Sequence, residues 1–282
     1  MGNPGSSKTQ EIRFLLLCCL TCLFVINLTG CTNKTEIIAH RGASYLAPEN
    51  TMSSIMLGWE KNSDVEIDVH LSKDNRIVVI HDANTKRISG VDLQVNKATL
   101  QELRQLDMGH FKGEQFKGER IPLIQEVIKT IPPKRKLYVE IKCGSEILPF
   151  LKPIIEKSRK ESQIVIIGFD LKTVADAKKS MPKIPVYWLK NTTKDKETDK
   201  YIPHDPELVQ TVREHGLDGL DVHYAGVTRK FSDAVKSAKL KLYVWTVDNP
   251  EEVARLVKLN VSGITTNRPE WLKERLQLEL NQ

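Results

Sequence analysis

The sequence predicts an α/β fold, a (β/α)8 barrel with a small insertion after the second strand. Short apolar runs alternate with segments of helical spacing along the chain, which is typical of a parallel sheet covered by helices. Eight such units fit into about 250 residues, the usual length of a closed barrel of this kind. The expected strands are 36–39, 64–71, 137–141, 164–168, 185–189, 219–222, 242–246 and 263–266.

The amino terminus precedes this fold and has the composition of an export signal. Lys8 and Arg13 are followed by an apolar run, 14–26, that is short for a membrane span. We therefore exclude residues 1–30 as a signal peptide. The run ends in Leu-Thr-Gly before Cys31, which resembles a bacterial lipobox, so we expect an exported cell-envelope lipoprotein held to the membrane by a lipid on Cys31. An ordinary signal peptide or a short uncleaved anchor remains the alternative.

The mature chain, 31–282, is expected to be one barrel domain without a disulfide framework. The formal net charge of +6 comes from basic residues that are interleaved with acids, which suits anionic substrates or a phospholipid surface but specifies neither. No sustained basic or aromatic pattern indicates nucleic acid binding. After Cys31, the one remaining cysteine is Cys143. The oligomeric state is not predicted.

The first elements in chain order carry most of the ionisable residues of interest. The strand 36–39 delivers His40 and Arg41, and Gly42 permits a sharp turn there. A helix is expected over 50–61, followed by the strand 64–71. Asp74-Asn75 predicts a turn, after which 76–81 returns as an extended segment that ends at a second histidine, His81.

The stretch 83–136 is too long for a simple strand-to-helix connection, so we interpret it as the insertion. Thr99 and Glu102 have the spacing of a capping box at the start of a helix. The glycine-rich segment 109–118 is expected to be a mobile loop, and 121–131 a helix that is stopped by two prolines. From Leu137 the alternation is regular. Helices are expected at 146–161, 171–179, 206–215, 229–238, 250–259 and 269–278, and Pro206, Pro250 and Pro269 stand where three of them begin.

Three carboxylates are expected at the mouth of the barrel and predict a metal site. Glu66 and Asp68 are two residues apart on one strand, so their side chains leave the same face, and Glu140 and Lys142 have the same spacing on the next barrel strand. Carboxylates that converge cannot all stay ionised without a cation. One divalent cation with oxygen ligands, Mg²⁺ or Ca²⁺, satisfies this requirement. Each pair alone has a simpler explanation, a solvated strand edge or an ion pair.

Two histidines and two positively charged side chains accompany these carboxylates. His40 and His81 each follow an apolar strand, and histidine gives and takes protons near neutral pH. We expect them to be the proton-transfer pair. Arg41 and Lys142 are expected to neutralise a phosphate. A substrate role for His70 is possible from its place on the strand, but a structural role is the simpler interpretation.

Taken together and in order, these residues resemble the glycerophosphodiester phosphodiesterases over nearly the whole mature chain. The resemblance rests on the runs His40-Arg41-Gly42, Pro48-Glu49-Asn50-Thr51, Glu66-x-Asp68, His81-Asp82, Glu140-x-Lys142 and Trp245-Thr246, and on the insertion with its Arg120-Ile121-Pro122-Leu123 segment. It implies hydrolysis of a glycerophosphodiester to sn-glycerol 3-phosphate and an alcohol.

The resemblance also implies roles for single residues. Glu66, Asp68 and Glu140 would hold the cation, and His40 and His81 would be the general acid and base. It places Glu49 in the site after the first strand and Trp245 as an aromatic wall. One departure is Asn267, where the family usually has aspartate.

Two other functions remain open from the sequence. The same barrel with two histidines and a metal could act as a lysophospholipase D or a sphingomyelinase D, although the Glu-x-Lys pair and the insertion favour small soluble diesters. A non-catalytic surface binding protein is the third possibility, and the intact set of acids and histidines argues against it.

Overall fold

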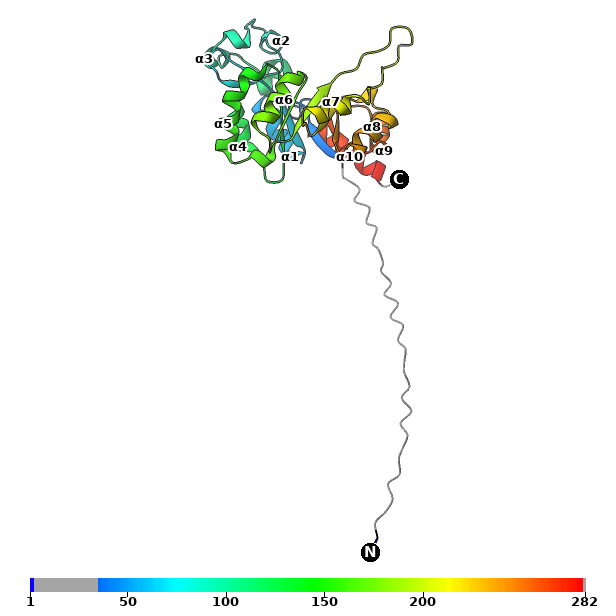
Figure 1. Cartoon of the computed structure of the whole chain (residues 1–282). Coiled ribbons are helices and arrows are strands. Elements are labelled where there is room, and N and C mark those ends of the chain that lie inside the picture. The colour runs from blue at the N-terminus through cyan, green and yellow to red at the C-terminus, as the bar shows by residue number, and fades with distance from the viewer. Residues whose placement is uncertain (3–34, 281–282) are drawn as a thin grey trace. The chain divides into compact units, whose positions relative to one another are not determined.

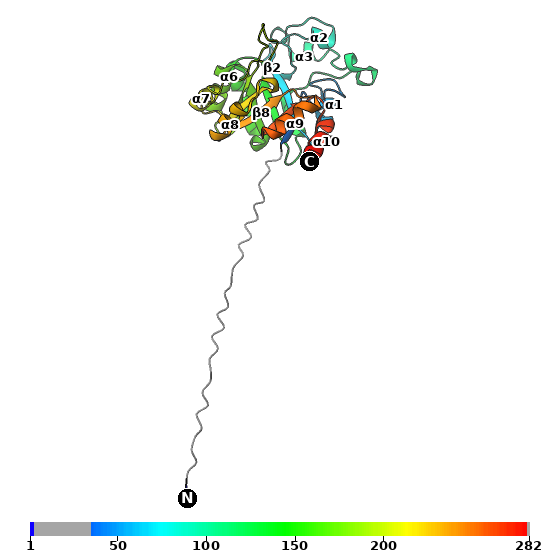
Figure 2. The same cartoon turned by 90° about the vertical axis from the view of Figure 1, so that its right-hand side faces the viewer.

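The computed structural model describes residues 1–2 and 35–280. Within this part of the chain, eight parallel strands close into a barrel, because the first strand pairs with both the second and the last. The predicted (β/α)8 fold is confirmed, and Figures 1 and 2 show the helices around the strands. The barrel strands are β1 (Glu36–Ala39), β2 (Asp64–Leu71), β4 (Leu137–Ile141), β5 (Ile164–Gly168), β6 (Val186–Lys190), β7 (Gly219–His223), β8 (Lys241–Trp245) and β9 (Gly263–Thr266).

The helices follow the strands in sequence, and most of their bounds lie within two residues of the predicted ones. The barrel helices are α1 (Met52–Glu60), α4 (Ile124–Thr130), α5 (Leu148–Ser158), α6 (Leu171–Ser180), α7 (Leu208–Glu214), α8 (Arg229–Ser237), α9 (Pro250–Lys258) and α10 (Pro269–Leu280). Pro250 and Pro269 do begin α9 and α10. The prediction for Pro206 was wrong, since α7 begins at Leu208, after a turn in which the Val209 amide bonds the Pro206 carbonyl.

Strand alternation separates the two faces of the barrel and decides which residues reach its interior. On β2, Val65, Ile67 and Val69 belong to the layer that packs under the helices. Glu66 and Asp68 alternate with them and therefore face the interior. A second, interior layer fills the barrel below the site. It consists of Ile38, Tyr138, Val165, Ile167, Tyr187, Leu189 and Tyr243.

The tyrosines of the interior layer close the end of the barrel at which the strands begin. The hydroxyl groups of Tyr138 and Tyr243 donate to the carboxylate of Glu36, over 2.9 and 3.2 Å. The rings of Tyr187 and Tyr243 stack with centroids 4.8 Å apart. Because this end is filled and hydrogen-bonded, the opposite end, where the strands terminate, is the one open to a ligand.

A small separate core holds the insertion together. Strand β3 (Ile77–Val79) pairs antiparallel with β2, and α2 (Lys86–Ser89) and α3 (Leu100–Leu103) follow it. Thr99 and Glu102 form the predicted capping box of α3. The apolar residues of this core are Val78, Ile80, Ile88, Val95, Ala98, Leu103, Leu106, Met108, Ile121 and Leu123. In Figures 1 and 2, α2 and α3 lie at the end of the barrel away from the carboxyl terminus.

The segment 109–118 is more regular than predicted. It contains two short 3-10 helices, His110–Lys112 and Glu114–Phe116. The carboxylate of Asp107 accepts from the amides of Gly109, His110 and Gly118, which fixes both ends of the segment. The sequence prediction overlooked the hydrogen-bonding capacity of this aspartate, and the mobility of the segment stays a prediction.

The signal peptide and Cys31 lie outside the described residues, apart from Met1 and Gly2. No helix in the part of the chain that the structure describes has the length and apolarity needed to cross a bilayer. Lipid attachment at Cys31 remains a prediction.

Candidate active site

A tight turn after β1 places His40 and Arg41 at the open end of the barrel. Arg41 and Gly42 both have left-handed backbones, with φ of 54° and 77°. A Cβ at Gly42 would overlap the backbone of Ser54, so this position needs glycine. The unfavourable conformation of Arg41 is compensated locally, since its carbonyl accepts from the Asn50 amide and the Ser54 hydroxyl.

The three predicted carboxylates converge on one point of the barrel interior. Asp68 and Glu140 are register partners on β2 and β4. Each of Glu66, Asp68 and Glu140 offers an oxygen, and these oxygens all lie within 4.8 Å of one another. All three residues are buried, with exposed fractions of 2%, 1% and 9%.

Two oxygens of the carboxylate cluster accept no hydrogen bond, and this suits the binding of a divalent cation. Oε1 of Glu66 and Oδ1 of Asp68 are buried and accept no hydrogen bond. Their second oxygens are satisfied, because the Arg41 amide donates to Glu66 over 2.8 Å and the Asn50 side chain donates to Asp68 over 2.8 Å. Buried acceptors without a donor are costly, and carboxylate oxygens are the ligands that Mg²⁺ and Ca²⁺ prefer. These residues therefore suit a hard cation.

The electrostatics of the cluster lead to the same conclusion. Burial and the charges of Asp68 and Glu140 raise the pKa of Glu66 well above its usual range. Burial and the charge of Asp68 likewise raise the pKa of Glu140 to about 7. A bound cation removes this penalty because it attracts the ionised form of each carboxylate.

Arg41 and Lys142 flank the cluster and carry the nearest positive charges. Arg41 Nη1 donates to Glu49 over 2.8 Å, and its Nε lies 3.4 Å from Asp68. Lys142 Nζ donates to Glu140 over 2.7 Å. Both side chains are less than one-fifth exposed, so their charges act in a weakly screened environment. The arrangement can hold a dianionic or monoanionic phosphate next to a cation.

A hairpin, rather than a barrel strand, delivers His81. Strand β3 runs back along the edge of β2, so that the Ile80 amide donates to the Asp68 carbonyl. His81 therefore arrives at the level of the carboxylate cluster. His70 holds it there, since its Nε2 lies 3.0 Å from the His81 carbonyl oxygen. This contact gives His70 a structural role, the simpler of the two interpretations.

The two histidines have different partners on Nδ1. Nδ1 of His81 donates to the Asp82 carboxylate over 2.6 Å, and its Nε2 lies 3.2 Å from Lys142 Nζ. Nδ1 of His40 lies 2.7 Å from Oδ1 of Asn267. Burial and the adjacent Arg41 charge lower the pKa of His40 to about 4, so His40 is neutral at physiological pH. Each histidine thus has its Nδ1 engaged. Nε2 of His40 is left for a substrate, whereas Nε2 of His81 already contacts Lys142, which a substrate proton would have to displace.

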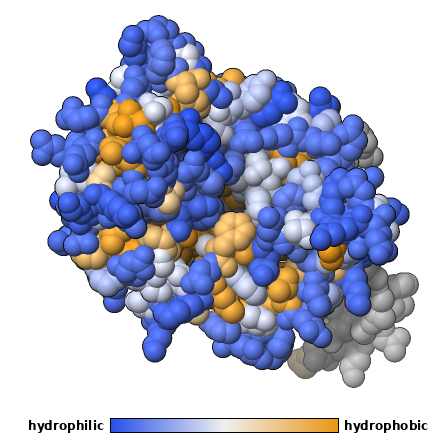
Figure 3. All heavy atoms as spheres, turned by 90° about the horizontal axis from the view of Figure 1, so that it is seen from above, coloured by the Kyte–Doolittle hydropathy of each residue, from blue (hydrophilic) through white to orange (hydrophobic). Residues whose placement is uncertain are grey.

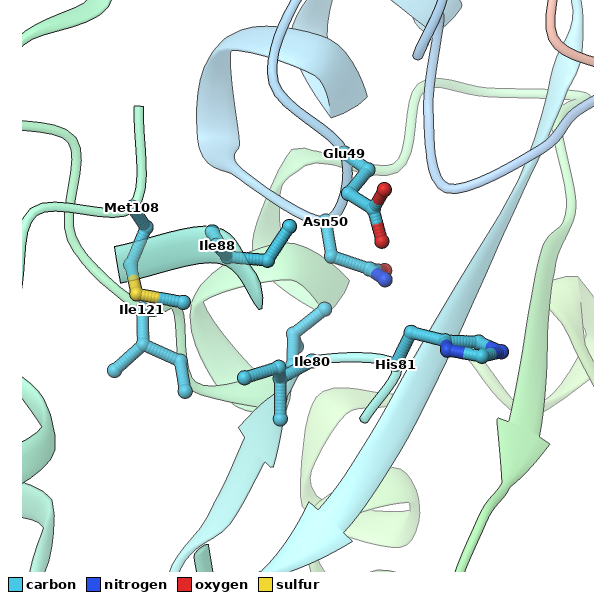
Figure 4. A pocket seen from close by; sticks show the side chains of 8 residues that line it. Glu49, Asn50, Ile80, His81, Ile88, Met108 and Ile121 are labelled. Carbon is cyan, nitrogen blue, oxygen red and sulfur yellow. The ribbon is translucent and has the colours of Figure 1, made fainter. Parts of the chain in front are cut away.

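Arg87 of the insertion joins the two histidine-bearing segments, and the sequence did not single it out. Its guanidinium donates twice to Glu49, over 3.0 and 2.8 Å, and once to Asp82, over 2.6 Å. Although burial opposes it, hydrogen bonding to Arg87 and the charge of Arg41 lower the pKa of Glu49 to about 2. Figure 4 shows Glu49 and Asn50 above His81, beside apolar side chains of the insertion core.

Trp245 faces the open end of the barrel within an aromatic group. Its indole donates to the Asp221 carbonyl over 3.2 Å, and the rings of Phe169 and His223 meet it edge-on, with centroids 5.6 and 5.3 Å away. Lys142 Nζ lies 5.7 Å from the centroid of Phe169, so this wall adjoins the charged cluster. Phe169 and His223 were not predicted, although both follow strand ends in the sequence.

Comparison with known proteins identifies the family. The model of the glycerophosphoryl diester phosphodiesterase family matches residues 40–271. The chain belongs to this family. A glycerophosphodiester phosphodiesterase from Caldanaerobacter subterraneus subsp. tengcongensis is 33% identical over 251 residues, which cover 85% of this chain and 96% of that protein. The prediction of a phosphodiesterase enzyme is therefore confirmed.

Two solved structures of phosphodiesterases share the fold. A phosphodiesterase from Oleispira antarctica, in complex with the product sn-glycerol 3-phosphate, is 25% identical, with a TM-score of 0.77 and coverage of 86% of this chain and 96% of that chain. A glycerophosphodiester phosphodiesterase from Thermotoga maritima is also 25% identical, with a TM-score of 0.68 and coverage of 85% and 97%. The phosphodiesterase family depends on a divalent metal, in keeping with the buried carboxylates of this chain.

Proposed function

We propose that this phosphodiesterase hydrolyses glycerophosphodiesters to sn-glycerol 3-phosphate and an alcohol, with one divalent cation and two histidines. The observation that carries the proposal is the buried trio Glu66, Asp68 and Glu140, in which two oxygens lack a hydrogen-bond donor. The product bound to the Oleispira antarctica enzyme supports the choice of product. The ion is Mg²⁺ or Ca²⁺, because the donor set consists of oxygen atoms.

The residues around the cluster divide the binding of the substrate between them. Glu66, Asp68 and Glu140 would hold the cation, which when bound draws charge off the phosphoryl oxygens. Arg41 and Lys142 would contact the remaining phosphate oxygens, and Glu49 would hold the Arg41 guanidinium in place. The Trp245 wall would border the alcohol or the glycerol carbons. The surface in Figure 3, on the side of α2 and α3, is mostly polar, which suits a small soluble diester.

The two histidines would move protons in a two-step reaction. Nε2 of one histidine takes the proton of the glycerol hydroxyl next to the phosphorylated carbon, and that oxygen attacks phosphorus. The bond from phosphorus to the head-group oxygen breaks, and the other histidine gives its proton to the departing alcohol. The product of this step is a five-membered cyclic phosphate. Water then opens the ring, with the two histidines in exchanged roles.

Direct attack by water is the competing route, and it uses the same residues. Only the cyclic route needs the neighbouring hydroxyl group. We therefore expect a 2-deoxy analogue of glycerophosphocholine to bind as an inhibitor without being cleaved. Ready cleavage of this analogue would contradict the cyclic route and leave direct attack by water.

A release assay tests the proposal as a whole. Purified Cys31–Gln282 is supplied with glycerophosphodiesters, treated with EDTA and given back Mg²⁺ or Ca²⁺, and sn-glycerol 3-phosphate is measured. We expect His40→Ala and His81→Ala each to lower kcat by about 10²–10⁴-fold. His215→Ala is the matched control, because this exposed histidine bonds only the carbonyl of its own helix. Equal kcat values in all three variants would contradict the acid–base assignment.

The same assay separates the two alternative functions. A turnover of lysophosphatidylcholine that exceeds that of glycerophosphocholine would indicate a lysophospholipase D. Absence of metal-stimulated hydrolysis with every diester would indicate a binding protein.

A further inference from the structure

Asp248 lies directly behind a residue that contacts His40, in the loop between β8 and α9. Its carboxylate accepts three hydrogen bonds and forms no salt bridge with any lysine, arginine or histidine of the described residues. Oδ1 accepts from the Thr266 hydroxyl over 2.7 Å and from the Asn267 amide over 3.0 Å. Oδ2 accepts from the side-chain Nδ2 of Asn267 over 2.5 Å. Asp248 thus clamps both the backbone and the side chain of Asn267.

This clamp fixes the orientation of the Asn267 amide. An ionised carboxylate is an acceptor only, so the nitrogen of the amide must face Asp248. The oxygen of the amide must then face the opposite way, toward His40. There Oδ1 lies 2.7 Å from Nδ1 of His40 and accepts from the Ser44 hydroxyl over 2.9 Å, which occupies both of its lone pairs. A reversed amide would set two acceptors against each other at 2.5 Å.

The orientation of the amide in turn decides which ring nitrogen of His40 carries the proton. Because Oδ1 of Asn267 only accepts, Nδ1 of His40 must be the protonated nitrogen in the neutral ring, and Nε2 must carry the lone pair. Without Asp248 the amide could turn over and donate to Nδ1, which would move the proton to Nε2. The carboxylate therefore acts on the ring from two hydrogen bonds away.

We propose that Asp248 is a positioning residue for the reaction, which holds His40 in the Nδ1-protonated tautomer through Asn267. The proposal rests on the acid–base role given to His40 above. It also accounts for Asn267, which stands where the resembled family usually has aspartate. The amide transmits the orientation set by Asp248, while the negative charge stays one residue away from the ring.

The test uses the isosteric variant Asp248→Asn, in the full mature enzyme supplied with Mg²⁺ or Ca²⁺. The backbone amide of Asn267 keeps the oxygen of the new side chain in the place of Oδ1, so the new NH2 group faces the Asn267 side chain and favours the reversed amide. We expect kcat to fall at least about 10- to 100-fold, the scale for losing a hydrogen-bond partner that orients a metal-bound histidine, with KM for glycerophosphocholine unchanged. The ¹⁵N spectrum of the His40 ring, assigned with a His40→Gln sample, should show Nδ1 protonated in the wild type and a mixture of tautomers in the variant.

Two further variants separate positioning from a structural effect. Glu251→Gln removes a carboxylate from the same region that accepts no hydrogen bond in the structure, and it should leave kcat and the His40 spectrum unchanged. The double variant Asp248→Asn, Asn267→Asp places a carboxylate, which only accepts, directly beside Nδ1 of His40. It should restore the Nδ1-protonated tautomer and recover most of the lost kcat.

The outcomes distinguish this proposal from the proposed function. If Asp248→Asn keeps the wild-type tautomer, the proposal is overturned, whatever happens to kcat. If the tautomer changes and kcat does not, both the proposal and the acid–base role of His40 are overturned. A His40→Ala enzyme with undiminished turnover would overturn the acid–base role and, with it, the catalytic purpose of the clamp, whereas the ring spectrum of the Asp248→Asn variant would still report whether Asp248 sets the tautomer.

Discussion

Replacement of Arg87 by glutamine should weaken both the fold and the catalysis, although this side chain is 47% exposed. The variant loses three charge-assisted hydrogen bonds, two to Glu49 and one to Asp82. Glu49 then no longer braces Arg41, and Asp82 no longer fixes His81. A substitution in the insertion therefore disturbs both Arg41, a proposed phosphate contact, and His81, a proposed acid–base residue.

The magnitude follows from the two carboxyl groups. The pKa of Glu49 falls from 4.5 to about 2, and that of Asp82 from 3.8 to about 2, with Arg87 the strongest lowering influence on each. At about 1.36 kcal/mol per pKa unit, these shifts correspond to roughly 3 and 2 kcal/mol from all favourable partners together. Arg87 is half exposed and shared between the two groups, so we expect its loss to cost about 2 kcal/mol at pH 7.

The sign of the pH dependence is fixed by the lowered pKa values. A carboxyl group whose pKa is depressed by folding stabilises the protein above its unfolded pKa, here 4.5 and 3.8. This contribution is lost as the pH falls toward 2. The difference between the wild type and Arg87→Gln should therefore be largest at pH 7 and should shrink below pH 4.5. Urea unfolding at pH 7 and pH 3.5 measures it.

Kinetics and a neighbouring control complete the test. We expect kcat of Arg87→Gln to fall by up to about 10²-fold, because Arg41 and His81 lose their alignment. Arg87→Lys should recover little, since lysine lacks the fork that binds both carboxylates. Lys86→Gln is the matched control, because its 70% exposed side chain lies 3.6 Å from an exposed aspartate. A variant Arg87→Gln with the stability and kcat of this control would refute the reasoning.

Three other predictions follow from the site and the amino terminus. Glu66→Gln should lose both cation affinity, measured by titration calorimetry, and turnover. The control variant Glu60→Gln, at an exposed residue, should keep both. Cation binding that survives in Glu66→Gln would exclude Glu66 as a ligand. Treatment of the wild type with EDTA should lower its melting temperature, because three buried carboxylates lose their counter-charge. Addition of Mg²⁺ or Ca²⁺ at about 100 times its Kd should restore about 2.7 kcal/mol of the free energy of unfolding. We propose that Cys31 is lipid-anchored in the cell envelope, so that Cys31→Ser should leave an unlipidated precursor; if the wild type incorporates no labelled fatty acid, an ordinary signal peptide is the better interpretation.

Local patterns in the sequence were enough to predict the barrel and the carboxylate cluster. Residues two apart on a strand leave the same face, so Glu66 and Asp68 had to share a side once β2 was recognised. Parallel strands end at one edge, which placed Glu140 beside them. Helix starts at Pro250 and Pro269 were equally local, because proline fixes its own backbone angle and lacks a donor.

The tertiary structure decided the contacts that depend on chain segments far apart in sequence. The β2–β3 hairpin sets the level of His81, and the insertion core aims Arg87 at Glu49 and Asp82. The regularity of 109–118 was not predicted for the same reason, since the Asp107 carboxylate accepts from amides up to eleven residues away.

The environment of His40 shows most clearly which features the sequence determined and which required the tertiary structure. The sequence determined that a histidine ends β1 and that an asparagine follows β9, because both facts are local. Only the closed barrel brings Asn267 within 2.7 Å of His40, since the first strand, β1, pairs with the last strand, β9, on closure. Asp248, which follows β8, lies behind Asn267 because β8 pairs with β9. The tautomer of the ring therefore depends on a carboxylate 208 residues away in the chain, because hydrogen-bond direction is a property of the assembled site.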